Sequence, residues 1–118
     1  MGVRTSFRME AEYITMVRGD TLSFALEIIG LDSDLDSAYF TVKKDLDSNE
    51  YLFQKSIGDG ITKIQTGVYV VRIAPDDTFS MDVGKYWYDL VIGKNGDVFT
   101  VKHGVLELIY DVTREETT

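Results

Sequence analysis

Hydrophobic and polar residues alternate along most of this 118-residue chain, in short runs separated by turn-forming residues. Over residues 21–29, Leu22, Phe24, Leu26 and Ile28 share one face of an extended chain. This period of two is typical of a half-buried β-strand. The pattern of short apolar runs between turns predicts further strands at 13–17, 38–43, 51–57, 61–65, 67–73, 85–92, 97–102 and 105–112. Eight or nine short strands, with a turn about every 8–12 residues, indicate an all-β sandwich or barrel.

Glycine, proline, aspartate and asparagine mark the turns between these runs. The Asn-Gly pair at 95–96 is a strong signal for a tight hairpin, and the Gly-Asp-Gly sequence at 58–60 predicts another turn. Pro75 ends the strand before it, because proline cannot continue a central ladder. One helical turn is expected at 78–82. Gly104 interrupts the last run, where we expect a bulge or a kink.

The length of the chain fits a single domain with a core of its own. Tyrosine, phenylalanine, valine, isoleucine and threonine recur throughout, which is the composition of strands rather than helices. We expect the sandwich to occupy residues 13–113. An N-terminal arm at 1–12 lacks clean periodicity, and a polar tail follows at 114–118. Cysteine is absent, so the fold does not depend on disulfides.

The charge of the chain is strongly acidic, with 12 basic and 20 acidic residues and a formal net charge of −8. Such a surface repels phosphate backbones, so we expect no nucleic-acid partner. No apolar run approaches the length of about 18 residues that a membrane-spanning helix needs, so we expect no membrane partner. The N-terminus lacks the apolar core of a signal peptide, which predicts a protein made in the cytoplasm.

The segment Asp-Val-Gly-Lys-Tyr at 82–86 opens a predicted strand and is typical of a tyrosine corner. In such a corner, which Asp82 begins here, the ring of Tyr86 packs into the core, its hydroxyl bonds to the backbone upstream, and Gly84 permits the close chain passage that the corner needs. A plain turn before a strand is the alternative. The corner predicts an immunoglobulin-like antiparallel β-sandwich. It is not of the antibody type, because Tyr88 stands where antibody domains have cysteine.

Strand parity after the corner predicts which side chains face out. If Tyr86 faces the core, then Trp87 and Val91, at odd positions of the same strand, face outward. Tyr39 has the outward parity on its own strand. Large aromatic side chains on an outer face are candidate binding anchors, so Trp87, Tyr39 and Val91 are candidate partner contacts. The alternative is that the arm or a second copy of the chain covers Trp87.

No arrangement of residues indicates a catalytic or cofactor site. His103 is the only histidine, and without cysteine it cannot complete a zinc site. It has no evident serine partner, and the chain contains no Gly-x-Ser-x-Gly sequence. Carboxylates are plentiful, but a small enzyme of this kind needs two of them converging in a deep pocket. We therefore expect no catalytic residues, no cofactor and a protein that is not an enzyme.

Three aspartates at 32, 34 and 36 resemble the start of a calcium loop. An EF-hand loop needs glycine at its sixth position and glutamate at its twelfth. Those positions hold Ser37 and Lys43, so the motif fails and no metal site is predicted. Turn formation is the commoner use of such aspartates, and a looser calcium site stays an open alternative.

Several short motifs together resemble small domains of phage and prophage structural proteins. They are Val-Arg-Gly-Asp-Thr at 17–21, Ala-Tyr-Phe-Thr-Val-Lys-Lys at 38–44, Gln-Lys at 54–55, Ala-Pro-Asp-Asp-Thr at 74–78 and Gly-Lys-Tyr-Trp-Tyr-Asp at 84–89. The pattern is similar to the immunoglobulin-like N-terminal domain of baseplate upper proteins of phages of Gram-positive bacteria, and it covers roughly residues 13–113. The resemblance implies a virion structural role and no catalytic residues. It does not extend to the further segments that hold receptor-binding proteins in that family, so direct host recognition is not implied.

The resulting hypothesis is a non-enzymatic structural interaction protein of a prophage virion, in its tail, baseplate or head–tail region. It would act by contacts of its sheet faces and edges with other virion proteins or with copies of itself. A carbohydrate- or cell-surface-binding β-sandwich module is the alternative, in which Trp87 and Tyr39 would form a platform for sugar rings.

Overall fold

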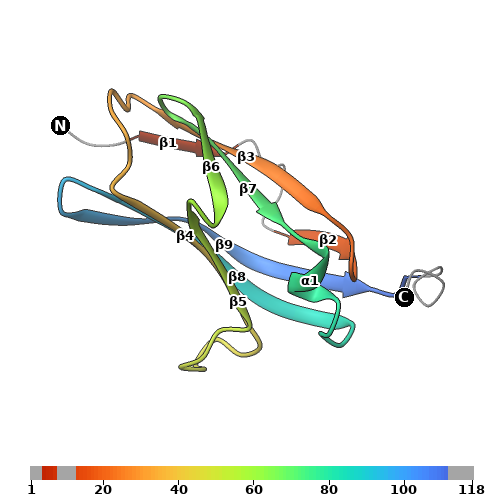
Figure 1. Ribbon diagram of the computed structural model, residues 1–118. Coiled ribbons are helices and arrows are strands. Elements are labelled where there is room, and N and C mark those ends of the chain that lie inside the picture. The colour runs from red at the N-terminus through yellow and green to blue at the C-terminus, as the bar shows by residue number, and fades with distance from the viewer. Residues whose placement is uncertain (1–3, 8–12, 112–118) are drawn as a thin grey trace.

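The computed structural model describes residues 4–7 and 13–111, the first of these ranges by its backbone alone. It contains nine strands and one short helix (Figure 1). They are β1 (Arg4–Phe7), β2 (Tyr13–Val17), β3 (Leu22–Ile29), β4 (Ser37–Lys43), β5 (Phe53–Ile57), β6 (Gly60–Gln65), β7 (Val68–Ile73), α1 (Pro75–Thr78), β8 (Gly84–Lys94) and β9 (Asp97–Ile109). The polar tail expected at 114–118 lies outside the described residues.

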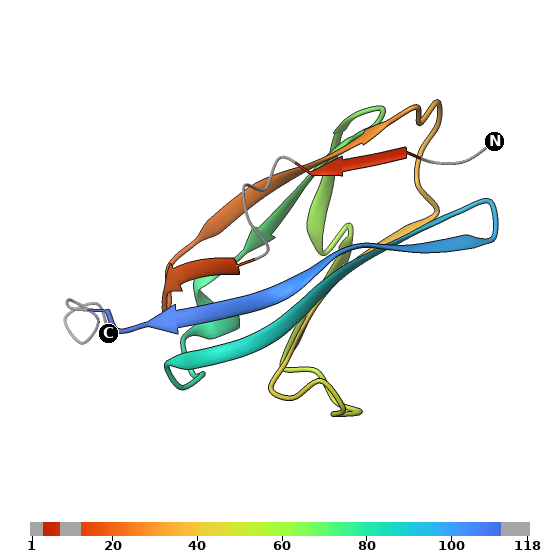
Figure 2. The same cartoon turned by 180° about the vertical axis from the view of Figure 1, so that it is seen from behind.

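The strands form one continuous ladder that folds over into two layers. Its order is β1-β3-β7-β6-β5-β4-β8-β9-β2. Figures 1 and 2 show β1, β3, β7 and β6 in one layer and β5, β4, β8, β9 and β2 in the other. The pairs are antiparallel except β2–β9 and β5–β6, which are parallel. The prediction of an all-β sandwich is confirmed, with two parallel pairs where antiparallel pairing was expected. The strands expected at 97–102 and 105–112 form the single strand β9.

The core lies between the two layers and is made by the alternate residues that the sequence pattern assigned to it. Phe40 is at its centre, fully buried, with its ring centroid 5.4 Å from that of Phe24, 5.5 Å from Tyr88 and 6.3 Å from Phe53. These rings come from both layers, since Phe24 lies on β3 and the other three lie on β4, β5 and β8. Aromatic packing therefore joins the two sheets in the absence of a disulfide.

The N-terminal segment differs from the expected arm. Residues 4–7 form β1, which pairs with β3, while β2 pairs with β9 in the opposite layer. The first two strands thus occupy the two ends of the ladder. The sequence pattern missed β1 because a four-residue strand shows too little alternation to stand out. The remaining residues of the expected arm, 1–3 and 8–12, lie outside the described part.

The bulge expected at Gly104 lies elsewhere on β9. Gly104 pairs in register with Tyr88, and the register shifts where Leu90 faces Lys102 and Val91 faces Thr100, which leaves Val101 as the extra residue. The extra residue changes the parity of the strand. Leu106, at an even position, is buried beyond the bulge, while Phe99, at an odd position, packs against the core before it.

The helical turn also begins earlier than expected, at Pro75 rather than residue 78. Proline is favoured in the first turn of a helix because its missing N–H has no intrahelical partner there. The carboxylate of Asp77 accepts the N–H of Ala74 at 2.7 Å and caps this turn. The same carboxylate pairs with Lys55 at 2.6 Å, which ties α1 to β5.

Candidate functional site

The tyrosine corner at the start of β8 fixes the orientation of that strand. The hydroxyl of Tyr86 donates a hydrogen bond to the carbonyl oxygen of Asp82 at 2.7 Å, which is the bond expected of such a corner. Gly84 has a φ of 139°, a conformation that only glycine adopts readily. A Cβ at this position would meet no atom within 4 Å, so the expectation of a close chain passage at Gly84 is wrong, and the glycine is needed for its backbone conformation. Burial raises the pKa of the buried Tyr86 above 10.0, and the nearby charge of Asp82 adds to the effect. The corner therefore sets which residues of β8 point out of the sandwich.

The outward residues of β8 form a row across the second layer, as strand parity predicted. Trp87 is 40% exposed, while Asp89 and Val91 are partly buried. Trp87 lies between Val105 of β9 and Lys43 of β4 in the ladder. We call the outer surface of β4, β8, β9 and β2 the aromatic face, because Trp87, Tyr39 and Tyr13 are exposed on it.

Tyr39 and Val91 lie next to each other on the aromatic face, at a distance from Trp87. Tyr39 is 43% exposed and pairs with Val91. Trp87 pairs with Lys43, four residues along β4, which corresponds to about 13 Å of extended strand. Trp87 and Tyr39 are therefore too far apart to stack on one sugar ring, and a platform made by both would have to contact different rings of a longer glycan.

Tyr13 is a third aromatic residue of this face, and the sequence pattern did not single it out. It is 43% exposed, and its hydroxyl donates to a carboxylate oxygen of Glu107 at 2.5 Å, which raises its pKa. The ammonium of Lys85 lies 5.8 Å from its ring centroid. Its position follows from the parallel pairing of β2 with β9, which no local sequence signal reveals.

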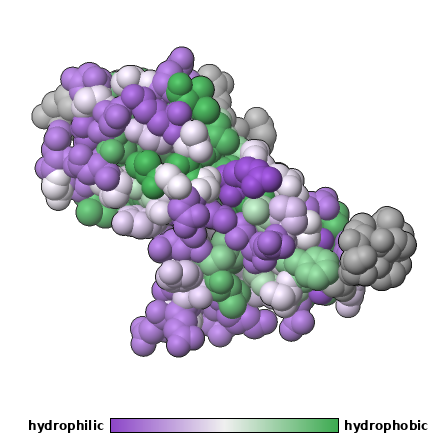
Figure 3. Space-filling model, in the orientation of Figure 1, coloured by the Kyte–Doolittle hydropathy of each residue, from purple (hydrophilic) through white to green (hydrophobic). Residues whose placement is uncertain are grey.

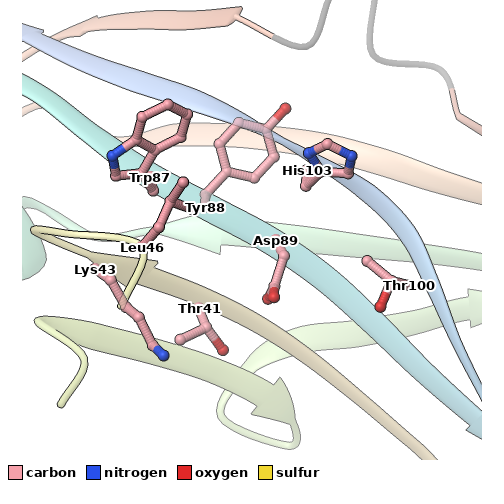
Figure 4. Close-up of a pocket in the computed structure, with 8 residues that line it drawn as sticks. All are labelled: Thr41, Lys43, Leu46, Trp87, Tyr88, Asp89, Thr100 and His103. Atoms are coloured by element: carbon pink, nitrogen blue, oxygen red, sulfur yellow. The ribbon is translucent and has the colours of Figure 1, made fainter. Parts of the chain in front are cut away.

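A shallow hollow of about 240 Å³ opens on the aromatic face beside Trp87 (Figure 4). β4, β8, β9 and the segment between β4 and β5 contribute its lining. The lining residues are Thr41, Lys43, Leu46, Trp87, Tyr88, Asp89, Thr100 and His103. The hollow is smaller than the pockets of about 300–1,000 Å³ that hold drug-sized ligands, so it suits one side chain or one ring.

Asp89 is the carboxylate of the hollow. It is half-buried, and this burial raises its pKa above the ordinary 3.8, although the positive charges of Lys43 and His103 act in the opposite direction. It forms no hydrogen bond or ion pair with any residue that the structure describes. The ammonium of Lys43 instead donates to the carbonyl oxygen of Ser48 at 2.8 Å. Asp89 thus has an incompletely compensated negative charge in a partly water-excluded place.

His103 faces Asp89 across the β8–β9 ladder and is exposed at the rim of the hollow. Sequence reasoning placed it beside a bulge and gave it no role. The structure brings it together with Asp89 and Thr41 because all three lie in one row of the sheet. The hollow holds a single carboxylate among its lining residues, so it lacks the pair of acids that a glycosidase requires.

The aspartates at 32, 34 and 36 form structural contacts. Asp36 accepts the N–H of Asn95 at 2.8 Å, and Asp34 pairs with Lys63 at 2.5 Å. The carbonyl oxygen of Asp34 accepts a hydrogen bond from the buried Lys94 at 2.7 Å. Among residues 13–111, no group of three or more aspartate, glutamate or histidine side chains is placed to hold a metal ion.

Exposure alone does not distinguish the aromatic face. Hydrophobic side chains also reach the surface elsewhere, as with Ile64 at 59%, and Figure 3 shows apolar patches between hydrophilic ones. The aromatic face differs because three exposed aromatic residues share it and one of them, Trp87, lines a hollow. Its central charges also balance, with Lys43 and Lys85 against Asp89 and Glu107, in a chain of net charge −8.

Comparisons with known proteins identify the fold. No family model and no curated protein matches the chain, and no described helix is long and apolar enough to cross a membrane. Among solved structures, the chain is similar to murine CRIg, with a TM-score of 0.53 and 12% identity over 95% of this chain and 100% of that one. It also matches domain 1 of VCBP3 from Branchiostoma floridae, with a TM-score of 0.38 and 13% identity over 92% and 97%. The likeness to CRIg shows the fold alone, which is an immunoglobulin-like β-sandwich.

Proposed function

We propose that this protein is a non-enzymatic interaction module that binds other proteins through its aromatic face. The observation that carries the proposal is the exposure of the single tryptophan, Trp87, beside a hollow on a regular sheet face. Tryptophan and tyrosine residues in or beside such hollows are typical anchors of protein interfaces. Tyr39 and Val91 form a second apolar contact on the same face.

The charge distribution supports the choice of this face. A chain with a net charge of −8 repels other acidic proteins, including its own copies, over most of its surface. On the aromatic face, Lys43 and Lys85 equal Asp89 and Glu107 in number, so these four residues together have no net charge. This region permits close approach of a second protein at the smallest electrostatic cost.

The free edge of β2 offers a second mode of contact. β2 is the last strand of the ladder, so its far edge has no partner strand among those described. An edge strand of this kind can add to the sheet of a neighbouring protein through backbone hydrogen bonds. Tyr13 lies on β2 and joins this edge to the aromatic face.

We further propose that the partners are proteins of a prophage virion or other copies of this chain. The support is the sequence resemblance to the immunoglobulin-like domain of baseplate upper proteins. The fold, which has the same sandwich architecture, is compatible with that role. Repeated contacts of small rigid domains by face and edge are a means of building such assemblies.

Sedimentation velocity over micromolar to millimolar concentrations tests the aromatic face. We expect self-association that Trp87→Ala weakens about 30-fold, the equivalent of about 2 kcal/mol for an interface anchor. Ile64→Ala is the matched control, because Ile64 is more exposed but lies on β6 in the opposite layer. A chain that stays monomeric throughout, or an equal loss in both variants, contradicts self-association through this face.

Mass spectrometry of purified phage particles tests the virion role. Particles induced from the bacterium that carries the gene should contain this chain in a fixed ratio to the other structural proteins. Absence of the chain from particles that contain their complete tails would contradict the virion assignment, and the binding role of the face would stand separately.

A further inference from the structure

We infer that the hollow beside Trp87 receives the guanidinium group of an arginine side chain from the partner protein. This inference rests on the proposed function and names the chemistry of the partner at one point of the interface. It follows from the carboxylate, the indole, the size of the hollow and the charge of the whole chain.

The carboxylate of Asp89 favours binding of a positively charged group. It lies half-buried in the floor of the hollow and has no hydrogen bond or ion pair among the described residues. Lys43 is the lysine of the hollow, and its charge offsets part of that of Asp89, but its ammonium donates to the carbonyl oxygen of Ser48. A guanidinium that entered the hollow would give Asp89 the charge-assisted, bidentate hydrogen bonds that it lacks.

The indole of Trp87 provides a flat surface for the same group. Tryptophan is the side chain that attracts cations most strongly over its ring, and the planar guanidinium can stack on it. Trp87 and Asp89 lie two residues apart on β8 with the same strand parity, and both line the hollow, with the indole toward β9 and the carboxylate toward β4 (Figure 4). One arginine can therefore contact the ring and the carboxylate together.

The size and polarity of the hollow favour one extended side chain. A volume of about 240 Å³ is enough for the end of an arginine and too small for a folded segment. Leu46, which is 69% exposed on the segment between β4 and β5, offers an apolar contact for the methylene stem. The hydroxyl of Thr100 is an additional acceptor for the remaining N–H groups.

The net charge of the whole chain also favours a basic partner. A net charge of −8 attracts a basic segment over long range and raises its rate of encounter. Because the charged residues at the centre of the aromatic face sum to zero, this long-range attraction brings the basic segment to the protein but contributes little to the bound state. At short range, the contacts of Trp87 and Asp89 select arginine over a neutral side chain.

The fluorescence of Trp87 gives a specific test, because it is the only tryptophan in the chain. The probe is the capped tripeptide acetyl-Gly-Arg-Gly-amide, titrated at low salt into the intact protein. Its matched control has citrulline, which is neutral and has nearly the same shape, in place of arginine. We expect the arginine peptide to change the fluorescence with a dissociation constant at least about tenfold lower than that of the citrulline peptide.

Two variants separate the carboxylate of the hollow from the overall charge. Asp89→Asn should weaken binding of the arginine peptide about tenfold. Asp59→Asn removes the same unit of charge from the exposed turn between β5 and β6 and should leave binding unchanged. Added salt should weaken binding to the unmodified chain, because it screens both the contact with Asp89 and the attraction of the overall charge.

Several outcomes would overturn the inference. They are equal binding of the arginine and citrulline peptides, equal losses in the Asp89 and Asp59 variants, and binding of methyl glucoside in place of the peptide. The last result would assign the hollow to a sugar ring. If the peptide fails to bind while Trp87→Ala still abolishes association in sedimentation, only the arginine assignment is wrong. If self-association is also absent, the proposal that copies of the chain bind one another through the aromatic face fails as well.

Discussion

The inner and outer sides of β8 come from the same eleven residues but are held by different interactions. On the inner side, Tyr88 and Leu90 are buried in the core between the two layers. On the outer side, Trp87 and Asp89 contact a shallow hollow and solvent. The inner side chains are fixed by close packing, while the outer ones have no packing requirement that demands their identity.

This difference indicates where the function lies. A residue that packing does not require, and that is large and apolar or charged and half-buried, needs another reason for its presence. The corner at Tyr86 connects the two sides, because it fixes the rotation of the strand about its axis. The same hydrogen bond that directs Tyr88 inward thus directs Trp87 outward.

The largest expected effect comes from the inner side. Leu90→Ala removes a fully buried side chain and should lower the free energy of unfolding by about 2–5 kcal/mol. Val91→Ala, one residue further on the outer side, should cost less than about 1 kcal/mol. Urea denaturation followed by circular dichroism measures both. Equal losses would show that the outer side is packed as tightly as the inner side.

The corner hydrogen bond should have an intermediate effect. Tyr86→Phe removes the donor to the carbonyl oxygen of Asp82 and should cost about 0.5–1.5 kcal/mol at neutral pH. The pKa of Tyr86 is raised in the folded state, so its contribution is present below the ordinary value of 10.0 and is lost as the pH rises through the folded pKa.

The pH dependence of unfolding provides a control for the effect of Tyr86→Phe. The difference in unfolding free energy between the unmodified chain and Tyr86→Phe should narrow above pH 10.0. Tyr110→Phe, at a residue that is 73% exposed, should show no such difference at neutral pH. A Tyr86→Phe variant with unchanged stability at neutral pH would mean that packing of the ring alone holds the corner.

The sequence predicted the fold because most of its signals are local. The alternation of 21–29, the turns at glycine and the corner at Tyr86 each depend on neighbouring residues. β1 was missed because its place depends on pairing with β3, which is distant in sequence. The bulge at Val101 was placed at Gly104 because glycine suggested it, while the change of parity between Phe99, which packs against the core, and the buried Leu106 is the signal that locates it.

The site could be predicted only in part. Parity gave the outward direction of Trp87 and Tyr39, but not their separation, which depends on the register of β4 against β8. The meeting of His103 with Asp89 depends on the register of β9, beyond a bulge that the sequence did not locate. The contribution of Leu46 comes from an irregular segment, for which periodicity has no prediction.

The smallest expected effect on the free energy of unfolding comes from the outer side of β8. There a substitution should raise this free energy, whereas the substitutions above should lower it. Burial raises the pKa of Asp89 in the folded state above 3.8. The favourable contribution of Asp89 to the stability of the fold is therefore present below pH 3.8 and is lost as the pH rises through the folded pKa. Lys43 from β4 and His103 from β9 are the charged or titratable groups that face it, and they offset only part of the burial. At neutral pH, the ionised Asp89 therefore lowers the free energy of unfolding.

Asp89→Asn should accordingly leave the chain as stable as before at neutral pH or slightly more stable, and the difference should disappear below pH 3.8. Urea denaturation over this pH range measures it, with Asp59→Asn as the control for net charge. An equal gain in the control would attribute the effect to the overall charge of −8 rather than to the hollow. A gain confined to Asp89 means that the fold retains a carboxylate that lowers its own stability, which is expected of a residue kept for binding.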